Sequence, residues 1–203
     1  FINGALEKGY SQDLAENVFN LVEPFAGYAF NKAHSVSYGL VSYWTAYLKA
    51  NYAPEYMAAF LNAYMDKGDR LISAVADCRR IGIKVLPPDI NKSDVGFKIE
   101  TEEPGITCIR FGLAAIKNVG SEALEPFLNS REANGLFGSL EEICKKGNLG
   151  GVNKKSMESL VMCGAFDFFG DRSAILDVLD RVITLANEEA RLRTSNQASM
   201  FEM

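Results

Sequence analysis

The sequence predicts a mainly α-helical protein with a small β-hairpin near its middle and paired short helices after it. Apolar residues recur at helical spacing through most of residues 11–80. Two short β-type runs then flank a TEEPG turn, and from residue 112 short helical pieces alternate with glycine corners. A chain of 203 residues that is 48% apolar and 23% charged can bury one good core or two small ones.

The first eighty residues contain four predicted helices. Residues 11–23 form one that Ser11 caps and that Pro24 and Gly27 should end. A central helix follows, and Pro54 opens the next, which extends toward Gly68. The fourth runs over residues 69–80, with Leu71, Ile72, Val75 and Cys78 on its packed side and Gly82 as its stop.

The central helix carries two distinct faces. Val36, Leu40, Trp44 and Leu48 recur every four residues, which predicts a stripe that faces a core. The other face is a line of hydroxyl groups that ends in a cation: Ser35, Tyr38, Ser42, Thr45 and Lys49.

The start of that helix gathers hydrogen-bond donors. Asn31, Lys32, His34 and Ser35 surround the positive end of the helix dipole, with Tyr38 one turn on. Phosphate oxygens could be held there by several donors at once. The alternative is that Asn31 and His34 only cap and pack the helix.

This stretch resembles the fingers region of the C-family replicative DNA polymerases, the bacterial DNA polymerase III alpha subunits. The shared residues are Phe30, Asn31, Lys32, His34, Tyr38, Ser42, Tyr43, Ala46, Tyr47, Leu48 and Lys49. Ala33, Ser37 and the later Pro54 depart from the pattern. The resemblance implies that this helix start faces the incoming nucleoside triphosphate, so that Asn31, Lys32, His34, Ser35 and Tyr38 bind the nucleotide.

Residues 83–111 change character. A Pro pair at 87–88 forbids helix, and FKIE and ITCIRF predict a β-hairpin that must lean on its neighbours.

Residues 112–132 are predicted to form a short helix, a tight corner and a second helix that Ser121 caps, which resembles a helix-hairpin-helix motif. In that motif, bare backbone N–H groups at a helix start face a DNA phosphate. The predicted contacts are Lys117, Asn118, Val119, Gly120 and Ser121; Asn118 stands where a glycine is frequent, and it tolerates positive φ. An ordinary helical hairpin is the alternative.

A second corner and a run of lysines follow. Lys145, Lys146, Lys154 and Lys155 occur in a glycine-rich segment without acids, which could follow a phosphate backbone or be a solvated linker. The phrase L-x-x-x-G-A-F-D-x-x-G-x-R recurs in the polymerase family, and Leu160, Gly164, Ala165, Phe166, Asp167, Gly170 and Arg172 match it. The resemblance implies tandem helix-hairpin-helix units that bind duplex DNA regardless of sequence, with Lys154, Lys155 and Gly164 among the contacts. One last helix should run over residues 172–193.

The C-terminal residues lose the helical period. Gln197, Met200 and Phe201 resemble the Q-x-x-[L/M]-F peptide with which polymerases hold the sliding clamp. In such a peptide, the Met and Phe side chains enter an apolar pocket and the Gln side-chain amide makes hydrogen bonds at the edge of that pocket.

Other features limit the chemistry. A net charge of −5 argues against coating nucleic acid by bulk charge. The four cysteines have no C-x-x-C spacing, which favours reduced thiols in a cytoplasmic protein over a metal site. No D-x-D pair stands on a plausible strand, so no catalytic residue and no metal ligand is assigned; the resemblance places Mg²⁺ in a palm upstream of Phe1.

The sequence is therefore interpreted as a fragment of a replicative polymerase that is inactive alone. Its expected parts are a helical fingers segment (1–82), a small β-hairpin region (83–111), tandem helix-hairpin-helix units (112–193) and a tail with the clamp peptide (194–203). Its expected partners are primer–template duplex, incoming nucleoside triphosphate, the sliding clamp (beta subunit) and other replicase holoenzyme subunits in the bacterial cytoplasm, and no membrane. A non-enzymatic helix-hairpin-helix adaptor is the competing hypothesis, and a helical domain with a capped His the third.

Overall fold

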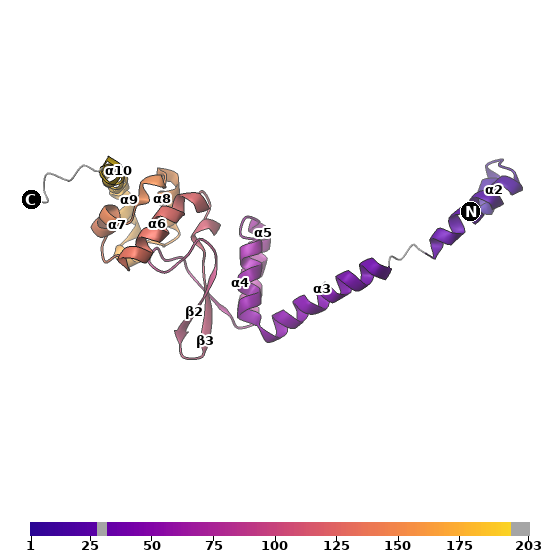
Figure 1. The fold of residues 1–203 in the computed structure, drawn as a ribbon, viewed down its shortest axis with the longest axis horizontal. Coiled ribbons are helices and arrows are strands. Elements are labelled where there is room, and N and C mark those ends of the chain that lie inside the picture. Colours follow the sequence, from indigo (N-terminus) through magenta and orange to yellow (C-terminus); the bar gives the residue numbers. More distant parts are fainter. Residues whose placement is uncertain (28–31, 196–203) are drawn as a thin grey trace, which may run out of the picture. The chain divides into compact units, whose positions relative to one another are not determined.

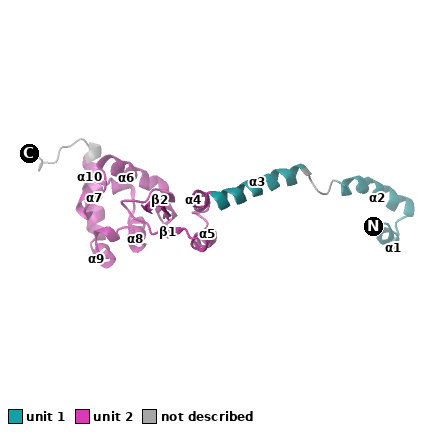
Figure 2. Ribbon diagram, turned by 90° about the horizontal axis from the view of Figure 1, so that it is seen from below, with its two compact units in different colours: residues 1–51 teal, residues 52–203 magenta. Residues whose placement is uncertain are grey.

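The computed structural model describes residues 1–27 and 32–195, with side chains at the gap edge and beyond residue 192 left out (Figure 1). The chain divides into two compact units, Phe1–Asn51 and Tyr52–Met203, which Figure 2 colours separately. This division differs from the expected boundaries at residues 82 and 111. The reason is that the helices expected to belong to the first segment share a core with the sheet that follows them.

The first unit contains α1 (Ile2–Glu7), α2 (Gln12–Ala26) and α3 (Lys32–Asn51). Ser11 caps α2 as predicted, with its Oγ accepting a bond from the Leu14 N–H at 3.4 Å. Pro24 lies inside α2 and does not end it, since a proline so near the C-terminus removes only one helical hydrogen bond.

The apolar stripe of α3 is exposed among the described residues of its own unit, contrary to the prediction of a core-facing side. Val36 is 72% exposed and Trp44 55% exposed, and Leu40 and Leu48 are also exposed. Periodicity predicted the amphipathic helix correctly, but it does not specify what covers the apolar face.

The second unit begins with two helices on a small sheet. α4 (Ala53–Ala63) has Pro54 in its first turn, and α5 (Gly68–Arg80) begins at the glycine expected to end the preceding region. The strands are β1 (Lys84–Leu86), β2 (Lys98–Glu103) and β3 (Ile106–Arg110), in the order β1-β3-β2. The β2–β3 pair is the predicted antiparallel hairpin, whereas β1, parallel to β3, was not predicted.

These elements enclose one core. Its buried residues are Met57, Ala58, Leu61, Leu71, Ala74, Cys78, Ile83, Phe97 and Ile109. Ile72, expected on the packed side of α5, is exposed, because Ala74 takes the inward position instead. Asn62 joins α4 to the hairpin: its side chain bonds the Phe97 N–H at 2.7 Å and the Phe97 carbonyl at 2.8 Å.

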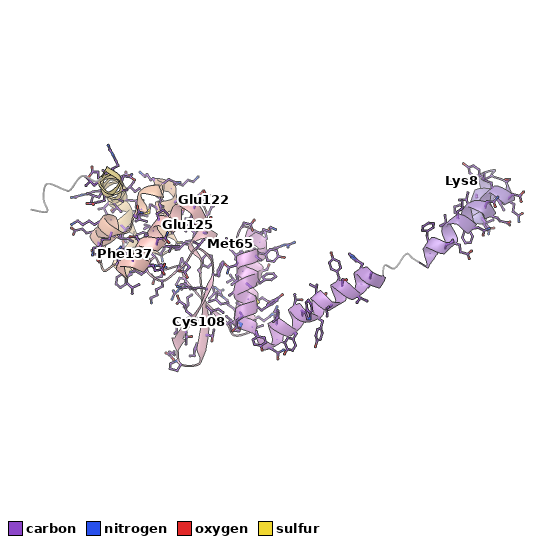
Figure 3. The ribbon with its side chains drawn as sticks, viewed as in Figure 1. Lys8, Met65, Cys108, Glu122, Glu125 and Phe137 are labelled. Atoms are coloured by element: carbon purple, nitrogen blue, oxygen red, sulfur yellow. The ribbon has the colours of Figure 1, made fainter. Side chains whose placement is uncertain are left out.

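The remaining elements form a larger helical core. They are η1 (Leu113–Ala115), α6 (Ser121–Asn134), α7 (Leu140–Lys146), η2 (Leu149–Gly151), α8 (Lys154–Met162), η3 (Asp167–Phe169), α9 (Arg172–Asp177) and α10 (Leu179–Ser195). Phe127, Phe137, Leu160 and Phe166 are among its fully buried residues, and Figure 3 labels Phe137.

Three details of this region differ from prediction. The N-cap of α6 is Gly120 rather than Ser121, and it makes no side-chain cap bond. The segment read as a possible linker contains the end of α7, η2 and the start of α8, and it buries Leu149 and Val152. The last helix is divided at Val178, where α9 ends and α10 begins.

None of the helices in the described ranges is both long enough and apolar enough to cross a lipid bilayer.

Candidate nucleic-acid interface

The start of α3 keeps two of its predicted donors together. The rings of His34 and Tyr38 lie 4.2 Å apart between centroids, tilted by 43°, and both side chains are exposed. Ser35 beside them is half-buried. Asn31 lies outside the described residues, and Lys32 is described only as the first residue of α3. The imidazole is therefore accessible and not buried in a core, while a nucleotide contact by these five residues stays a prediction.

The first corner of the hairpin region is held against α8. Asn118 has φ +70°, the left-handed conformation that this residue type tolerates. Its side-chain amide donates to Ser159 Oγ at 3.0 Å, and its carbonyl accepts from Ser156 Oγ at 2.5 Å. Val119 is buried next to it. Two side chains of α8 thus fix the conformation of a corner about 40 residues away in sequence.

Two cations flank this fixed corner. Lys117 precedes Asn118, Lys155 precedes Ser156, and both lysines are exposed. Neither takes part in an ion pair with any residue of the described ranges. Gly120 and Ser121 are also exposed, at the start of α6, where the first N–H groups of a helix lack intrahelical partners. The corner thus presents two ammonium groups beside free backbone donors.

Two acidic residues lie on α6 just after the corner. Glu122 and Glu125 are exposed on the first turns of α6, as labelled in Figure 3. Carboxylates repel phosphate, so these two acids disfavour an anion on their side of α6. Ser156 and Ser159, which build this arrangement, were missed by sequence reasoning, because nothing local in the sequence links them to Asn118.

The other three lysines of the basic run have acidic partners. Lys145 pairs with Glu141 at 2.8 Å, Lys146 with Glu142 at 2.9 Å and Lys154 with Asp180 at 2.6 Å. The hydrogen bond that the Lys154 ammonium donates to the Asp180 carboxylate raises the pKa of Lys154. The four lysines were expected to form a segment without acids. Acids outside that segment compensate three of them: Glu141 and Glu142 one turn earlier in α7, and Asp180 on α10.

The second corner is closed by an ion pair. Gly164 has φ +91° and is buried, and a Cβ at this position would overlap the Arg172 guanidinium. Arg172 holds Asp167 through Nε–Oδ1 and Nη2–Oδ2 bonds of 2.7 and 2.6 Å, and donates to the Met162 carbonyl at 3.1 Å. These bonds lower the pKa of the Asp167 carboxyl. The Asp167–Arg172 pair and the left-handed Gly164 thus fix the conformation of this turn. Contact of Gly164 with DNA stays a prediction.

The clamp-peptide residues Gln197, Met200 and Phe201 lie outside the described residues. In the part of the chain that the structure describes, no three His, Cys, Asp or Glu side chains gather as metal ligands would. Mg²⁺ was expected only outside this chain, and no step is assigned to it here.

Known proteins are similar to this chain both in its helix-hairpin-helix region and along nearly its whole length. Residues 82–175 match the sequence model of the helix-hairpin-helix motif. The chain is 42% identical over 201 residues to the DNA polymerase III subunit alpha of Thermus aquaticus. It is 39% identical over 202 residues to that of Escherichia coli strain K12 and 39% over 203 residues to that of Deinococcus radiodurans.

The chain is similar to one segment of the DNA polymerase III alpha subunit. The similarity covers 99% of this chain and 16% of the Thermus protein, and 100% of this chain and 15% of the Deinococcus protein. The resemblance found in residues 30–54, and the mainly helical fold with a helix-hairpin-helix region, are confirmed. The chain thus spans about one sixth of the length of the alpha subunits it matches.

Proposed function

We propose that this chain serves as a part of a DNA-directed DNA polymerase of the alpha-subunit type in the bacterial cytoplasm, and that its hairpin region holds duplex DNA by the phosphate backbone. The observation that carries the proposal is the first corner, where Asn118 is fixed to α8 and where Lys117 and Lys155 have no ion-pair partner among the described residues. The similarity to alpha subunits along the whole chain supports it.

The geometry favours binding without sequence preference. Ammonium groups and helix-start N–H groups recognise phosphates, which are the same at every base pair. The few unpaired cations at the corner and the net charge of −5 predict weak binding that few phosphate contacts support.

Duplex binding by the 203-residue chain tests this proposal. Fluorescence anisotropy with a labelled 20-base-pair duplex should show that Lys117→Ala/Lys155→Ala weakens binding about tenfold at low salt. Lys145→Ala removes one charge from an ion-paired position and should leave the affinity nearly unchanged. Equal affinities for the double variant and the wild type would show that DNA binds elsewhere or not at all.

For α3, we propose that its start contributes to nucleotide binding in a polymerase that includes a catalytic palm. The exposed His34–Tyr38 pair supports this role, because both groups can donate to phosphate or sugar oxygens. In that longer protein, Lys32→Ala or Tyr38→Ala should raise the KM for nucleotide or lower kcat. Unchanged values in both variants would show that the start of α3 does not bind the nucleotide, and would leave the hairpin region as the part of this chain with a proposed DNA contact.

For the tail, we propose docking to the sliding clamp through Gln197, Met200 and Phe201. Calorimetry should give an affinity of micromolar order that Phe201→Ala abolishes. Equal heats with and without Phe201 would show that this assignment is wrong.

A further inference from the structure

An aromatic ladder runs along one side of α4. Tyr56, Phe60 and Tyr64 occur every four residues, with ring centroids 6.3 Å apart for the first pair and 4.6 Å for the second. All three rings are only half-buried. A helix places side chains four residues apart on one face, so these rings form a continuous apolar surface.

Two cations lie over the last ring of this ladder. The Arg70 guanidinium is 5.0 Å and the Lys67 ammonium 5.6 Å from the centroid of the Tyr64 ring. Both side chains come from the turn and the first residues of α5, and both are exposed. Cations at this distance interact with the face of the ring, and a guanidinium can in turn stack on another planar group.

The ladder opens into a groove between α4 and α5. The groove has a volume of about 550 Å³, and Phe60, Tyr64, Arg70, Ser73 and Ala74 line it together with the carboxylates of Asp69 and Asp77. Arg80 pairs with Asp77 at 2.5 Å. This is enough room for a planar heterocycle against the two rings and the guanidinium.

We propose that this ladder and groove, residues 56–77 of α4 and α5, bind an unpaired stretch of single-stranded nucleic acid. Aromatic rings in line beside cations are the arrangement that holds single strands without reading sequence, because every base has a face that stacks. The site is separate from the hairpin corner, and its role does not depend on the proposed duplex contact.

The charges of the groove fix the orientation of the bound strand. Asp69 repels phosphate, whereas Arg80 compensates the charge of Asp77, so the backbone should lie on the side of Lys67 and Arg70, with the base in the groove. Inside the groove the Asp69 carboxylate can accept hydrogen bonds from exocyclic amino groups of cytosine and adenine. The groove thus fits a base with its sugar-phosphate outward, and not a phosphate-first ligand.

Photocrosslinking tests the position of the strand on the full 203-residue chain. A 12-nucleotide single strand with one 5-iodouracil, irradiated with the protein and analysed by mass spectrometry, should crosslink at Tyr56, Phe60 or Tyr64. Crosslinks found only at other residues would overturn the proposal.

Binding measurements separate this site from the duplex site. Tyr64→Leu should weaken binding of a 12-nucleotide single strand about tenfold, because one base loses its stacking partner. Lys67→Ala/Arg70→Ala should weaken binding and also lower its salt dependence. Arg79→Ala removes one positive charge from the exposed side of α5, outside the groove, and is the control for the loss of a nearby cation. Thermal unfolding by circular dichroism identifies variants that fail to fold, and Tyr64→Phe should bind as the wild type does.

Each result has one reading. Loss of single-strand affinity in the Tyr64 and Lys67/Arg70 variants, with duplex affinity kept, supports the proposal. Unchanged single-strand affinity in well-folded variants, or an equal loss in Arg79→Ala, overturns it. Binding of an apolar peptide that Tyr64→Leu abolishes while single-strand binding persists would assign the groove to a protein partner, and would also overturn it.

Discussion

Similar apolar residues are exposed on α3 and buried in the helical hairpin region. Leu160 on α8 is fully buried in a core built from its own unit, whereas Leu40 on α3 is 46% exposed. Both helices show a regular apolar period in the sequence. The hairpin region thus contains the packing that fixes its corner. The described residues of the first unit, in contrast, leave the apolar stripe of α3 exposed. An apolar period therefore indicates which side of a helix can be buried, and the surrounding fold determines whether it is.

The largest expected difference between the two regions is in stability. Leu160→Ala leaves a cavity among close-packed residues and should lower the free energy of unfolding by about 2–5 kcal/mol. Leu40→Ala removes an exposed side chain and should change it by less than about 0.5 kcal/mol. Urea denaturation followed by circular dichroism measures both, and equal losses would contradict the comparison.

Glycine substitutions sharpen the same contrast. Gly164→Ala requires a left-handed backbone and places a methyl group against Arg172, so we expect a loss of about 2–4 kcal/mol in the free energy of unfolding. Gly39 lies in α3 with no atom within 4 Å of an added Cβ. Gly39→Ala should therefore stabilise the helical state of α3 by about 1 kcal/mol, the difference in helix propensity between the two residues. The two variants should therefore differ in sign. A stable Gly164→Ala protein would show that the second corner is not locked.

The Asp167–Arg172 pair makes the hairpin region sensitive to acid. Arg172 lowers the pKa of Asp167 below its ordinary value of 3.8, so the pair stabilises the fold above that pH. This contribution is lost as the pH falls through the lowered pKa. Asp167→Asn should therefore be less stable than the wild type at pH 7, and the difference should shrink as the pH falls below 3.8 and vanish once the pH is below the lowered pKa of Asp167. Because both side chains are half-exposed, the difference will be modest. A difference independent of pH would point to packing and not to charge.

The smallest expected effect is spectroscopic, and it reports on α3 alone. Trp44 is the single tryptophan of the chain and lies on the exposed stripe. Its emission should resemble that of free tryptophan and should be quenched by acrylamide almost fully, with no change in the Leu160→Ala variant. A blue-shifted emission protected from acrylamide would show that the stripe is covered.

Local patterns in the sequence predicted much of this fold. The Ser11 cap, Pro54 in the first turn of α4, the hairpin and the positive φ of Asn118 all follow from local chemistry. The strand β1 was missed because a run of three residues is defined only by its pairing with β3. The short helix α7 was missed for a similar reason, since its seven residues make it hard to distinguish from a loop.

The site was predictable only in part. The corner residues Lys117 and Asn118 were found from their local pattern, and Lys155 from the basic run. The pairing of Lys154 with Asp180, however, depends on how α8 meets α10, which no local pattern encodes. The roles of Ser156 and Ser159 could not be predicted either, because their hydrogen bonds to Asn118 form only when α8 packs against the corner.

The most direct test of the account is the salt dependence of duplex binding by the wild type and by Lys117→Ala/Lys155→Ala. Each phosphate contact contributes about 0.9 to the slope of log affinity against log salt concentration. The account predicts that the double variant has a slope smaller by about 2, while Lys145→Ala keeps the wild-type slope. Identical slopes in all three proteins would contradict the assignment of the first corner as the place where this chain holds DNA.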